Sequence, residues 1–400
     1  MVCTYCQESH GLAGADAADE ITLGRYLPAI PLVDGTRCEV ACRGMSLPGE
    51  TVIRYERARK EYGDGTVAVE GLDLDVHAHE LLALVGPSGC GKSTTLRMAN
   101  RLVELTSGRL LVEGADVADA DPVALRRRMG YVIQNVGLFP HRTVEQNVAT
   151  VPRLLGWSRE RIRSRVVDLL ELVGLAPDTY ARRYPHQLSG GERQRVGVAR
   201  ALAVDPPVLL MDEPFGAVDP VGRRRLQAQF GRIRSELGTT VMLVTHDVDE
   251  AVRLGDRIAV FSRGGHLEQL ADPVSLLARP ATPMVADFVG QGAAVRLLGL
   301  GRLERADVGA PAGPAASGAS TGTSDGSWQG GPVRLGDPLD EVLGALATSP
   351  AGAVHVQDDA GAVVGSVTAD ALLRALHRMA DSAPAGSPAP AQPAVGSLRP

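Results

Sequence analysis

A glycine-rich segment from Gly86 to Ser93 has the residue types and the spacing needed to hold phosphate. It has the form G-x4-G-K-S, follows the apolar run Leu81–Val85 and precedes a stretch with helical character. Glycines let the backbone curl so that its N–H groups face phosphate oxygens, and the amino end of the next helix adds positive potential. Lys92 is predicted to neutralise charge on the β- and γ-phosphates of a nucleotide, and Ser93 to ligate Mg²⁺. The residues predicted to contact nucleotide here are Gly86, Pro87, Ser88, Gly89, Cys90, Gly91, Lys92, Ser93 and Thr94.

Two adjacent carboxylates, Asp212 and Glu213, follow a second apolar run at 208–211. Ligands of open α/β sheets bind outside the carboxyl ends of the strands, so this pair is predicted to lie beside the glycine-rich loop. Asp212 suits a direct or water-mediated contact to Mg²⁺, and Glu213 would orient and deprotonate an attacking water. The alternative is a pair of carboxylates at an ordinary strand end, which the neighbouring loop disfavours.

A third segment, Leu188-Ser-Gly-Gly-Glu-Arg-Gln194, begins a helix that is predicted to run to about Ala203. Ser189 and Glu192 have the spacing of a capping box. The glycines between them leave the first amide groups of the helix open to an anion. The segment resembles the signature of the ABC ATPases. That resemblance implies that Ser189 and Gly191, with Gly190 between them, contact the γ-phosphate of MgATP held by the loop of a second, identical subunit.

The resemblance to ABC ATPases covers about residues 53–290 and implies roles for four further residues. Gln134 resembles the glutamine that touches Mg²⁺ and the attacking water. Asp219 resembles the aspartate that reaches across the dimer interface, and His246 the switch histidine at the γ-phosphate. Tyr62 lies where the family has an aromatic residue stacked on adenine; the alternative is a tyrosine at a strand edge.

Four shorter segments resemble the ATPases of importers for glycine betaine, carnitine, choline and related osmoprotectants. They are Met98-Ala-Asn-Arg-Leu102, Gln134-Asn-Val-Gly-Leu-Phe-Pro-His141, Thr143-Val-Glu-Gln-Asn147 and Val151-Pro152. The resemblance implies a homodimer, integral membrane permease subunits and, indirectly, an extracytoplasmic solute-binding protein. An importer for another solute, such as a polyamine or an amino acid, stays open. A non-catalytic regulatory subunit is disfavoured by the presence of Glu213 and His246. An ABC protein of translation or DNA repair is disfavoured because one cassette occurs without a long coiled-coil insertion.

The elements that must position these residues alternate between short apolar strands and helices, which predicts an α/β fold with a mainly parallel sheet. The resemblance makes this a P-loop NTPase with a RecA-like core, an antiparallel β subdomain and a helical subdomain at about 144–188. Residues 258–261 and 266–270, joined by Arg263-Gly264-Gly265, are predicted to form a hairpin. We expect a disordered leader at 1–50, a flexible linker at 305–332 and a disordered tail at 381–400. Residues 333–380 resemble a single CBS module of α+β type.

Composition limits the kinds of partner and the location that this chain can have. A formal net charge of −6 argues against a nucleic-acid partner. No apolar run approaches the roughly 20 residues that cross a bilayer, and no secretory signal opens the chain, so we expect a protein peripheral to the cytoplasmic face of the membrane. The arginine runs 126–128 and 223–225 are predicted to be solvated helix faces. Cys3, Cys6, Cys38, Cys42 and His10 could together bind zinc. We favour the alternative, in which these residues belong to a disordered leader without a metal site.

Overall fold

The structure is a computed structural model that describes residues 49–134, 136–216, 218–310, 332–358, 360–383 and 387–388. The expectations for the leader and its cysteines, for most of the linker and for most of the tail lie outside the described residues.

A seven-stranded sheet forms the centre of the described chain, in the order β14-β10-β9-β3-β8-β7-β6. Five neighbouring strands are parallel: β9 (Arg257–Ser262), β3 (Leu81–Val85), β8 (Thr240–Val244), β7 (Val208–Asp212) and β6 (Met129–Val132). The strand β10 (His266–Ala271) pairs antiparallel with β9, as the predicted hairpin requires, and β14 is Ser387–Pro388. The predicted parallel sheet is therefore confirmed.

The central strands are apolar throughout because both of their faces are covered. All five residues of β3 are buried, and alternate residues enter two different cores. One core contains Leu81, Ala83 and Val85 and lies against helices; the other contains Leu82 and Leu84 and lies against a second sheet. That second sheet is antiparallel, in the order β2-β1-β4-β5. Its strands are β1 (Thr51–Glu61), β2 (Val67–His77), β4 (Ser107–Val112) and β5 (Ala115–Asp116).

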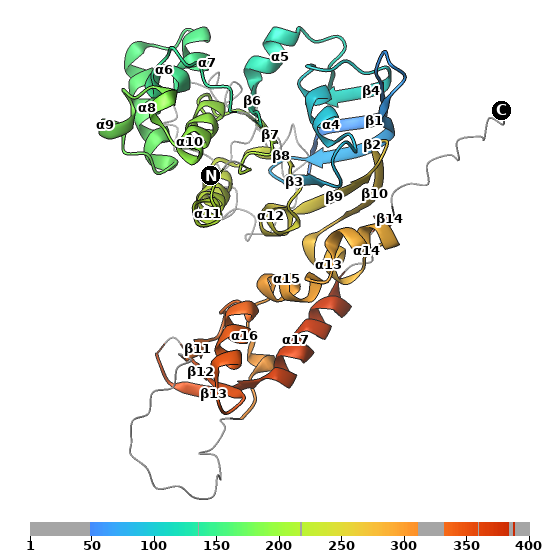
Figure 1. Cartoon of the computed structure of the whole chain (residues 1–400), viewed down its shortest axis with the longest axis vertical. Coiled ribbons are helices and arrows are strands. Elements are labelled where there is room, and N and C mark those ends of the chain that lie inside the picture. Colours follow the sequence, from blue (N-terminus) through green and yellow to red (C-terminus); the bar gives the residue numbers. More distant parts are fainter. Residues whose placement is uncertain are drawn as a thin grey trace, which may run out of the picture.

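Helices on the other side of the central sheet include a group that stands apart at one corner (Figure 1). The group comprises α6 (Val144–Val148), α7 (Thr150–Leu154), α8 (Arg159–Leu172), α9 (Pro177–Tyr180) and the 3₁₀ turn η1 (Pro185–Gln187). The amphipathic helix α8 buries Ile162, Val166 and Leu169. This group is followed directly by α10 (Gly190–Ala201), which ends two residues before the predicted end.

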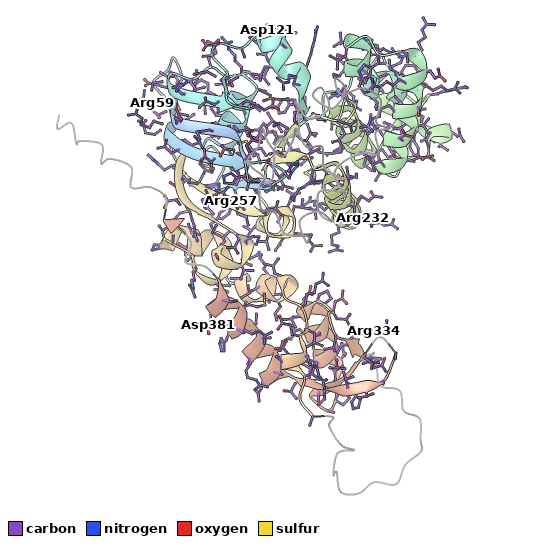
Figure 2. All side chains as sticks on the ribbon, turned by 180° about the vertical axis from the view of Figure 1, so that it is seen from behind. Arg59, Asp121, Arg232, Arg257, Arg334 and Asp381 are labelled. Carbon is purple, nitrogen blue, oxygen red and sulfur yellow. The ribbon has the colours of Figure 1, made fainter. Side chains whose placement is uncertain are left out.

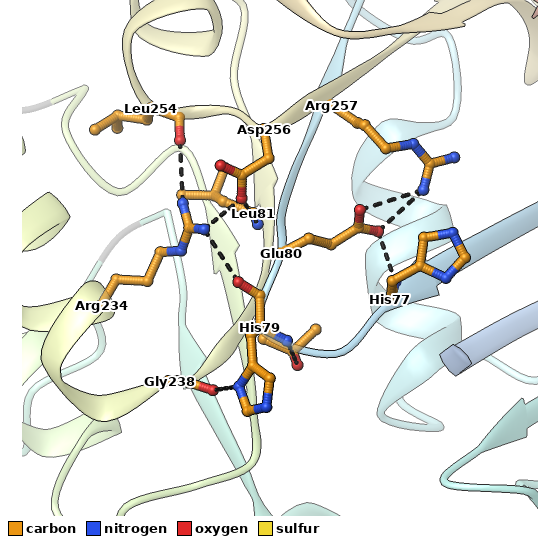
Figure 3. A network of polar contacts seen from close by, with 10 residues as sticks. His77, His79, Glu80, Leu81, Arg234, Gly238, Leu254, Asp256 and Arg257 are labelled. Atoms are coloured by element: carbon orange, nitrogen blue, oxygen red, sulfur yellow. Dashed lines mark hydrogen bonds and ion pairs between the residues drawn. The ribbon is translucent and has the colours of Figure 1, made fainter. Parts of the chain in front are cut away.

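The remaining cassette helices lie between or after the strands of the two sheets. They are α4 (Lys92–Ala99), α5 (Pro122–Arg128), α11 (Pro220–Leu237), α12 (Val248–Leu254) and α13 (Pro273–Ala278). Figure 3 shows how polar contacts fix the amino ends of the strands. Arg257 contacts both carboxylate oxygens of Glu80, at 3.1 and 3.2 Å, and Arg234 bridges Asp256 and the His79 carbonyl. These contacts hold the amino-terminal edge of the sheet. The residues predicted to bind nucleotide follow the strands at the opposite, carboxyl-terminal edge.

A smaller α/β unit follows the cassette along the chain (Figure 1). Its sheet has the order β11-β12-β13, formed by Val333–Arg334, Ala353–Gln357 and Val363–Thr368. The helices α16 (Leu339–Thr348) and α17 (Ala369–Ser382) cover it, with α14 (Pro283–Val289) and α15 (Ala293–Leu300) toward the cassette. Asp381 marks the end of α17 near the cassette in Figure 2, where Arg279 donates to the Ala380 and Asp381 carbonyls.

The structure differs from the prediction at the start of the linker. Residues 305–310 are part of the small unit: η2 spans Arg305–Asp307, and Gly309 bridges to Ser366. The cause is a buried polar residue, because Asp307 is 4% exposed and pairs with Arg378 of α17 at 2.6 Å. Composition alone suggested nothing to bury in this segment. Among the described residues, no helix has the length and apolar character needed to cross a membrane.

Candidate functional site

The glycine-rich loop connects β3 to α4 at the carboxyl edge of the central sheet. Pro87, Ser88 and Gly89 are exposed on the rim, whereas Lys92 is 7% exposed. Lys92 Nζ donates to the carbonyls of Gly86 at 2.8 Å and Pro87 at 2.9 Å. The ammonium group thus lies inside the curl of the loop, where phosphate oxygens would replace these carbonyls.

Close packing explains two of the loop glycines. Gly86 has φ 144°, and a Cβ there would lie 2.2 Å from the Phe261 carbonyl oxygen. Gly91 has φ 96°, and a Cβ there would lie 2.1 Å from the Ala68 carbonyl oxygen. Both positions therefore need glycine for conformation and for space.

The first carboxylate lies directly beside the loop. Ser93 Oγ donates to Asp212 Oδ1 at 2.8 Å, and Arg97 Nη2 lies 3.1 Å from Asp212 Oδ2. Asp212 is 1% exposed, so a cationic neighbour is needed to offset the buried charge. Desolvation works against the charge of Arg97, but Tyr131 and Asp212 outweigh it and raise the pKa of the guanidinium.

The second carboxylate, Glu213, is held by side chains that follow two other strands, β6 and β8. Gln134 Nε2 donates to Glu213 Oε2 at 2.8 Å, and His246 Nδ1 lies 3.2 Å from Glu213 Oε1. The Glu213 backbone is left-handed, with φ 47°, and its N–H donates to the Val244 carbonyl at 2.9 Å. A non-glycine residue at positive φ is strained, and such strain is typical of functional sites. The structure thus brings Gln134, Glu213 and His246 together.

The predicted Mg²⁺ ligands fit the ion. Ser93 and Asp212 offer hard oxygen atoms from adjacent elements, and the Gln134 amide has an oxygen opposite the nitrogen that contacts Glu213. In the part of the chain that the structure describes, no three His, Cys, Asp or Glu side chains cluster as a metal cage. Mg²⁺ at a nucleotide site does not need one, because phosphates and water complete its coordination.

The capping box predicted at the start of α10 is confirmed. Ser189 Oγ accepts from the Glu192 N–H at 3.3 Å, and Glu192 Oε2 accepts from the Ser189 N–H at 2.7 Å. Burial opposes the charge of Glu192, but these bonds and the Tyr180 hydroxyl lower the pKa of its carboxyl. Ser189 is exposed, and no hydrogen bond of the described residues joins 189–191 to the loop at 86–94. Within the described residues of one chain, the capped helix end is therefore not hydrogen-bonded to its own glycine-rich loop.

The two remaining predicted residues lie at the margins of the site. The Tyr62 hydroxyl lies 3.3 Å from Thr94 Oγ1, and the ring is 40% exposed with Lys60 Nζ 5.3 Å from its centroid. An open aromatic face beside the loop suits a stacked base. Asp219 precedes α11, and its Oδ1 accepts from the Gly222 N–H at 2.9 Å, as a helix cap does.

Sequence reasoning missed three residues around the site. Arg97 contacts Asp212, Gln194 is fully buried with Nε2 3.5 Å from the Glu213 carbonyl, and Arg223 contacts Asp247. Only Arg97 had a local signal, because it follows Ser93 by four residues and so shares its helix face. Arg223 also corrects the prediction for the run 223–225: Arg224 and Arg225 are exposed, but Arg223 is half-buried.

Comparison with known proteins gives consistent results. A family model described as ABC transporter matches residues 69–216. The glycine betaine/carnitine/choline transport ATP-binding protein OpuCA of Bacillus subtilis (strain 168) is 48% identical over 240 residues, which cover 60% of this chain and 63% of that protein. The chain thus spans less than two thirds of OpuCA.

Two further similarities cover more of the known protein. The glycine betaine uptake system ATP-binding protein YehX of Escherichia coli (strain K12) is 50% identical over 250 residues, 62% of this chain and 80% of YehX. A solved dimeric structure of the ATP-binding cassette MJ0796 in a post-hydrolysis state, bound to ADP and Pi, aligns with a TM-score of 0.51. It is 31% identical and covers 55% of this chain and 98% of that cassette. This chain belongs to the family of ABC transporter ATP-binding proteins.

Proposed function

We propose that this chain is the ATP-hydrolysing subunit of an ABC importer. The solute is a quaternary ammonium osmoprotectant such as glycine betaine, carnitine or choline. The observation that best supports ATP hydrolysis is that Gln134 and His246 both contact Glu213, beside the Ser93–Asp212 pair. The solute class is supported by the names of OpuCA and YehX.

The assembly we propose is a homodimer at the cytoplasmic face of the membrane, with permease subunits and an extracytoplasmic solute-binding protein as partners. Two observations support the dimer. The capped start of α10 is exposed at Ser189 without a hydrogen bond to its own loop among the described residues, and the MJ0796 cassette is dimeric. Head-to-tail pairing would place each Ser189–Gly191 segment over the loop of the other chain, so that each ATP contacts both subunits. Closure over ATP would then drive the permease, and hydrolysis would reopen the dimer.

The chemical roles follow from the contacts within the site. Lys92 and the loop amides bind the β- and γ-phosphates, and bound Mg²⁺ would neutralise charge that develops on the phosphoryl oxygens. Ser93, Asp212 and Gln134 would hold that ion. Glu213 takes a proton from the attacking water. Its carboxylate is aimed by Gln134 and His246, which contact one oxygen each.

For the small unit we propose a single CBS-like module at 333–380 that does not bind adenine nucleotides tightly by itself. Thr368, which could otherwise approach a ribose, caps α17 by accepting from the Ala371 N–H at 3.4 Å. Calorimetry of the full chain with AMP, after saturation of the cassette with ADP, tests this. Micromolar binding would contradict it.

The test of the proposed function is Glu213→Gln, which keeps the shape of the side chain and removes its basicity. MgATP should still bind, turnover should fall by about 10²–10⁴-fold, and a dimer should accumulate with MgATP in size-exclusion chromatography. Glu171→Gln, an exposed carboxylate of α8, is the matched control and should keep wild-type turnover. Wild-type phosphate release from the Glu213 variant would refute the role of Glu213. Stimulation of the reconstituted complex by a solute other than a quaternary amine would refute the solute class.

A further inference from the structure

Arg223 contacts two segments that belong to different parts of the site. It lies at the start of α11, four residues after Asp219, where its Nη2 donates to the Val218 carbonyl at 3.3 Å. Its Nη1 lies 3.4 Å from Asp247 Oδ2, and both side chains are about 30% exposed. A positive charge at the amino end of a helix is unfavourable toward the helix dipole, so stability of α11 does not explain an arginine here.

On one side, Arg223 holds the segment that leads into Asp219. Val218 is 5% exposed, and a Cβ at Gly191 would lie 3.4 Å from Val218 Cγ1. The turn is tight, because a Cβ at Gly222 would lie 2.7 Å from Asp219 Oδ2. The start of α10 and the Val218–Asp219 segment therefore form one packed unit, and Arg223 is bonded to it.

On the other side, Arg223 contacts the segment that contains His246. Asp247 follows His246 directly and caps α12, with Oδ1 accepting from the Asp249 N–H at 2.9 Å. The Asp247 N–H donates to Thr245 Oγ1 at 3.0 Å, which closes the turn around His246. A shift of Arg223 would therefore also shift Asp247 and its neighbour His246, which contacts Glu213.

We propose that Arg223 is a positioning residue that couples the two ATP sites of the dimer. The inference rests on the proposed function, in which Ser189–Gly191 and Asp219 serve the ATP of the partner, while His246 serves the ATP of its own chain. Arg223 connects these two sets within one subunit. Arginine suits the task because its planar fork of N–H donors can hold a carbonyl and a carboxylate together, which a single ammonium cannot do as well.

The test compares Arg223→Ala with Arg224→Ala and Arg225→Ala, which remove exposed arginines of the same helix. ATPase rates of the full chain are measured against MgATP concentration, and affinity is measured separately with a fluorescent ATP analogue. We expect a wild-type Hill coefficient above 1. Arg223→Ala should lower kcat about tenfold and move the Hill coefficient toward 1, with the affinity for the analogue changed less than twofold. The two controls should match wild type.

Two further variants keep the inference testable if Arg223→Ala folds poorly. Arg223→Lys keeps the charge and should restore the melting temperature but not the Hill coefficient. Asp247→Asn keeps a capping side chain, should act in the same direction as Arg223→Ala, and should add nothing to it in the double variant. Wild-type cooperativity in a folded Arg223→Ala or Arg223→Lys protein would overturn the inference, as would a wild-type Hill coefficient of 1. Absence of ATP hydrolysis by the wild type would instead overturn the proposed function.

Discussion

Replacing Gly91 by alanine should damage both the fold and nucleotide binding, and Gly114→Ala is a control that separates the two causes. Both glycines have positive φ, 96° and 77°, so alanine at either position bears the left-handed penalty of about 1–2 kcal/mol. At Gly114, between β4 and β5, nothing lies within 4 Å of the added Cβ. At Gly91, the Cβ would lie 2.1 Å from the Ala68 carbonyl oxygen.

That distance is far inside van der Waals contact, so the loop or β2 must move. Overpacking of this kind adds about 1–3 kcal/mol, which gives a total of roughly 2–5 kcal/mol for Gly91→Ala. The displaced backbone carries Lys92 and Ser93, and a misplacement of about 1 Å near reacting groups can lower rates about 10²-fold.

Urea unfolding followed by circular dichroism gives the stability of both variants, and calorimetry with MgATP gives their affinity. We expect Gly114→Ala to bind MgATP like the wild type despite its small loss of stability. Equal stability losses in the two variants, or unaltered MgATP binding by Gly91→Ala, would refute the argument that contact with Ala68 fixes the loop.

Three further predictions concern separate parts of the chain. Tyr62→Ala should weaken MgATP binding with little change in kcat, because the open ring would stack on the base; calorimetry and steady-state kinetics check this. Ser189→Ala should cost about 0.5–2 kcal/mol of stability by removing the cap of α10 and should also lower kcat, which melting curves and ATPase assays would show. Asp307→Asn should destabilise the small unit by about 1.5–3 kcal/mol by weakening the bonds from Arg378. Desolvation opposes the charge of Asp307, but Arg378 and the Glu304 N–H outweigh it and lower its pKa. The stabilisation by Asp307 is thus present above the ordinary aspartate pKa of about 3.9 and is lost as pH falls through the pKa in the folded protein. The melting temperatures of the wild type and of Asp307→Asn should therefore converge in acid.

The parts of the site that could be predicted from sequence are those that local physics determines. The loop at 86–93 needs only its glycines, a strand before it and a helix after it. The capping box of α10 is set within four residues, and its two reciprocal bonds are present. The carboxyl ends of β3, β7 and β8 must share one edge because the strands are parallel, and this brings Ser93 to Asp212.

What could not be predicted depends on side chains from segments far apart in the sequence. Nothing near Arg223 distinguishes it from Arg224 or Arg225; only the position of Asp247, 24 residues later, does so. The same holds for Asp307, whose partner Arg378 lies 71 residues further along the chain. An ion pair with one buried partner, as here, makes an apparently featureless segment part of a folded unit, and composition gives no sign of it.

The geometry of Glu213 bears on how hydrolysis is controlled. Its carboxylate contacts Gln134 and His246 of the same chain, and its left-handed backbone is held by the Val244 carbonyl. For the proposed role of Glu213 as the base, its carboxylate is therefore already oriented by side chains of its own chain. The Ser189 side chain, by contrast, is exposed, and its hydroxyl accepts from the Glu192 N–H of its own helix. If the second subunit supplies that segment, as proposed, we expect turnover to depend on assembly of the composite site.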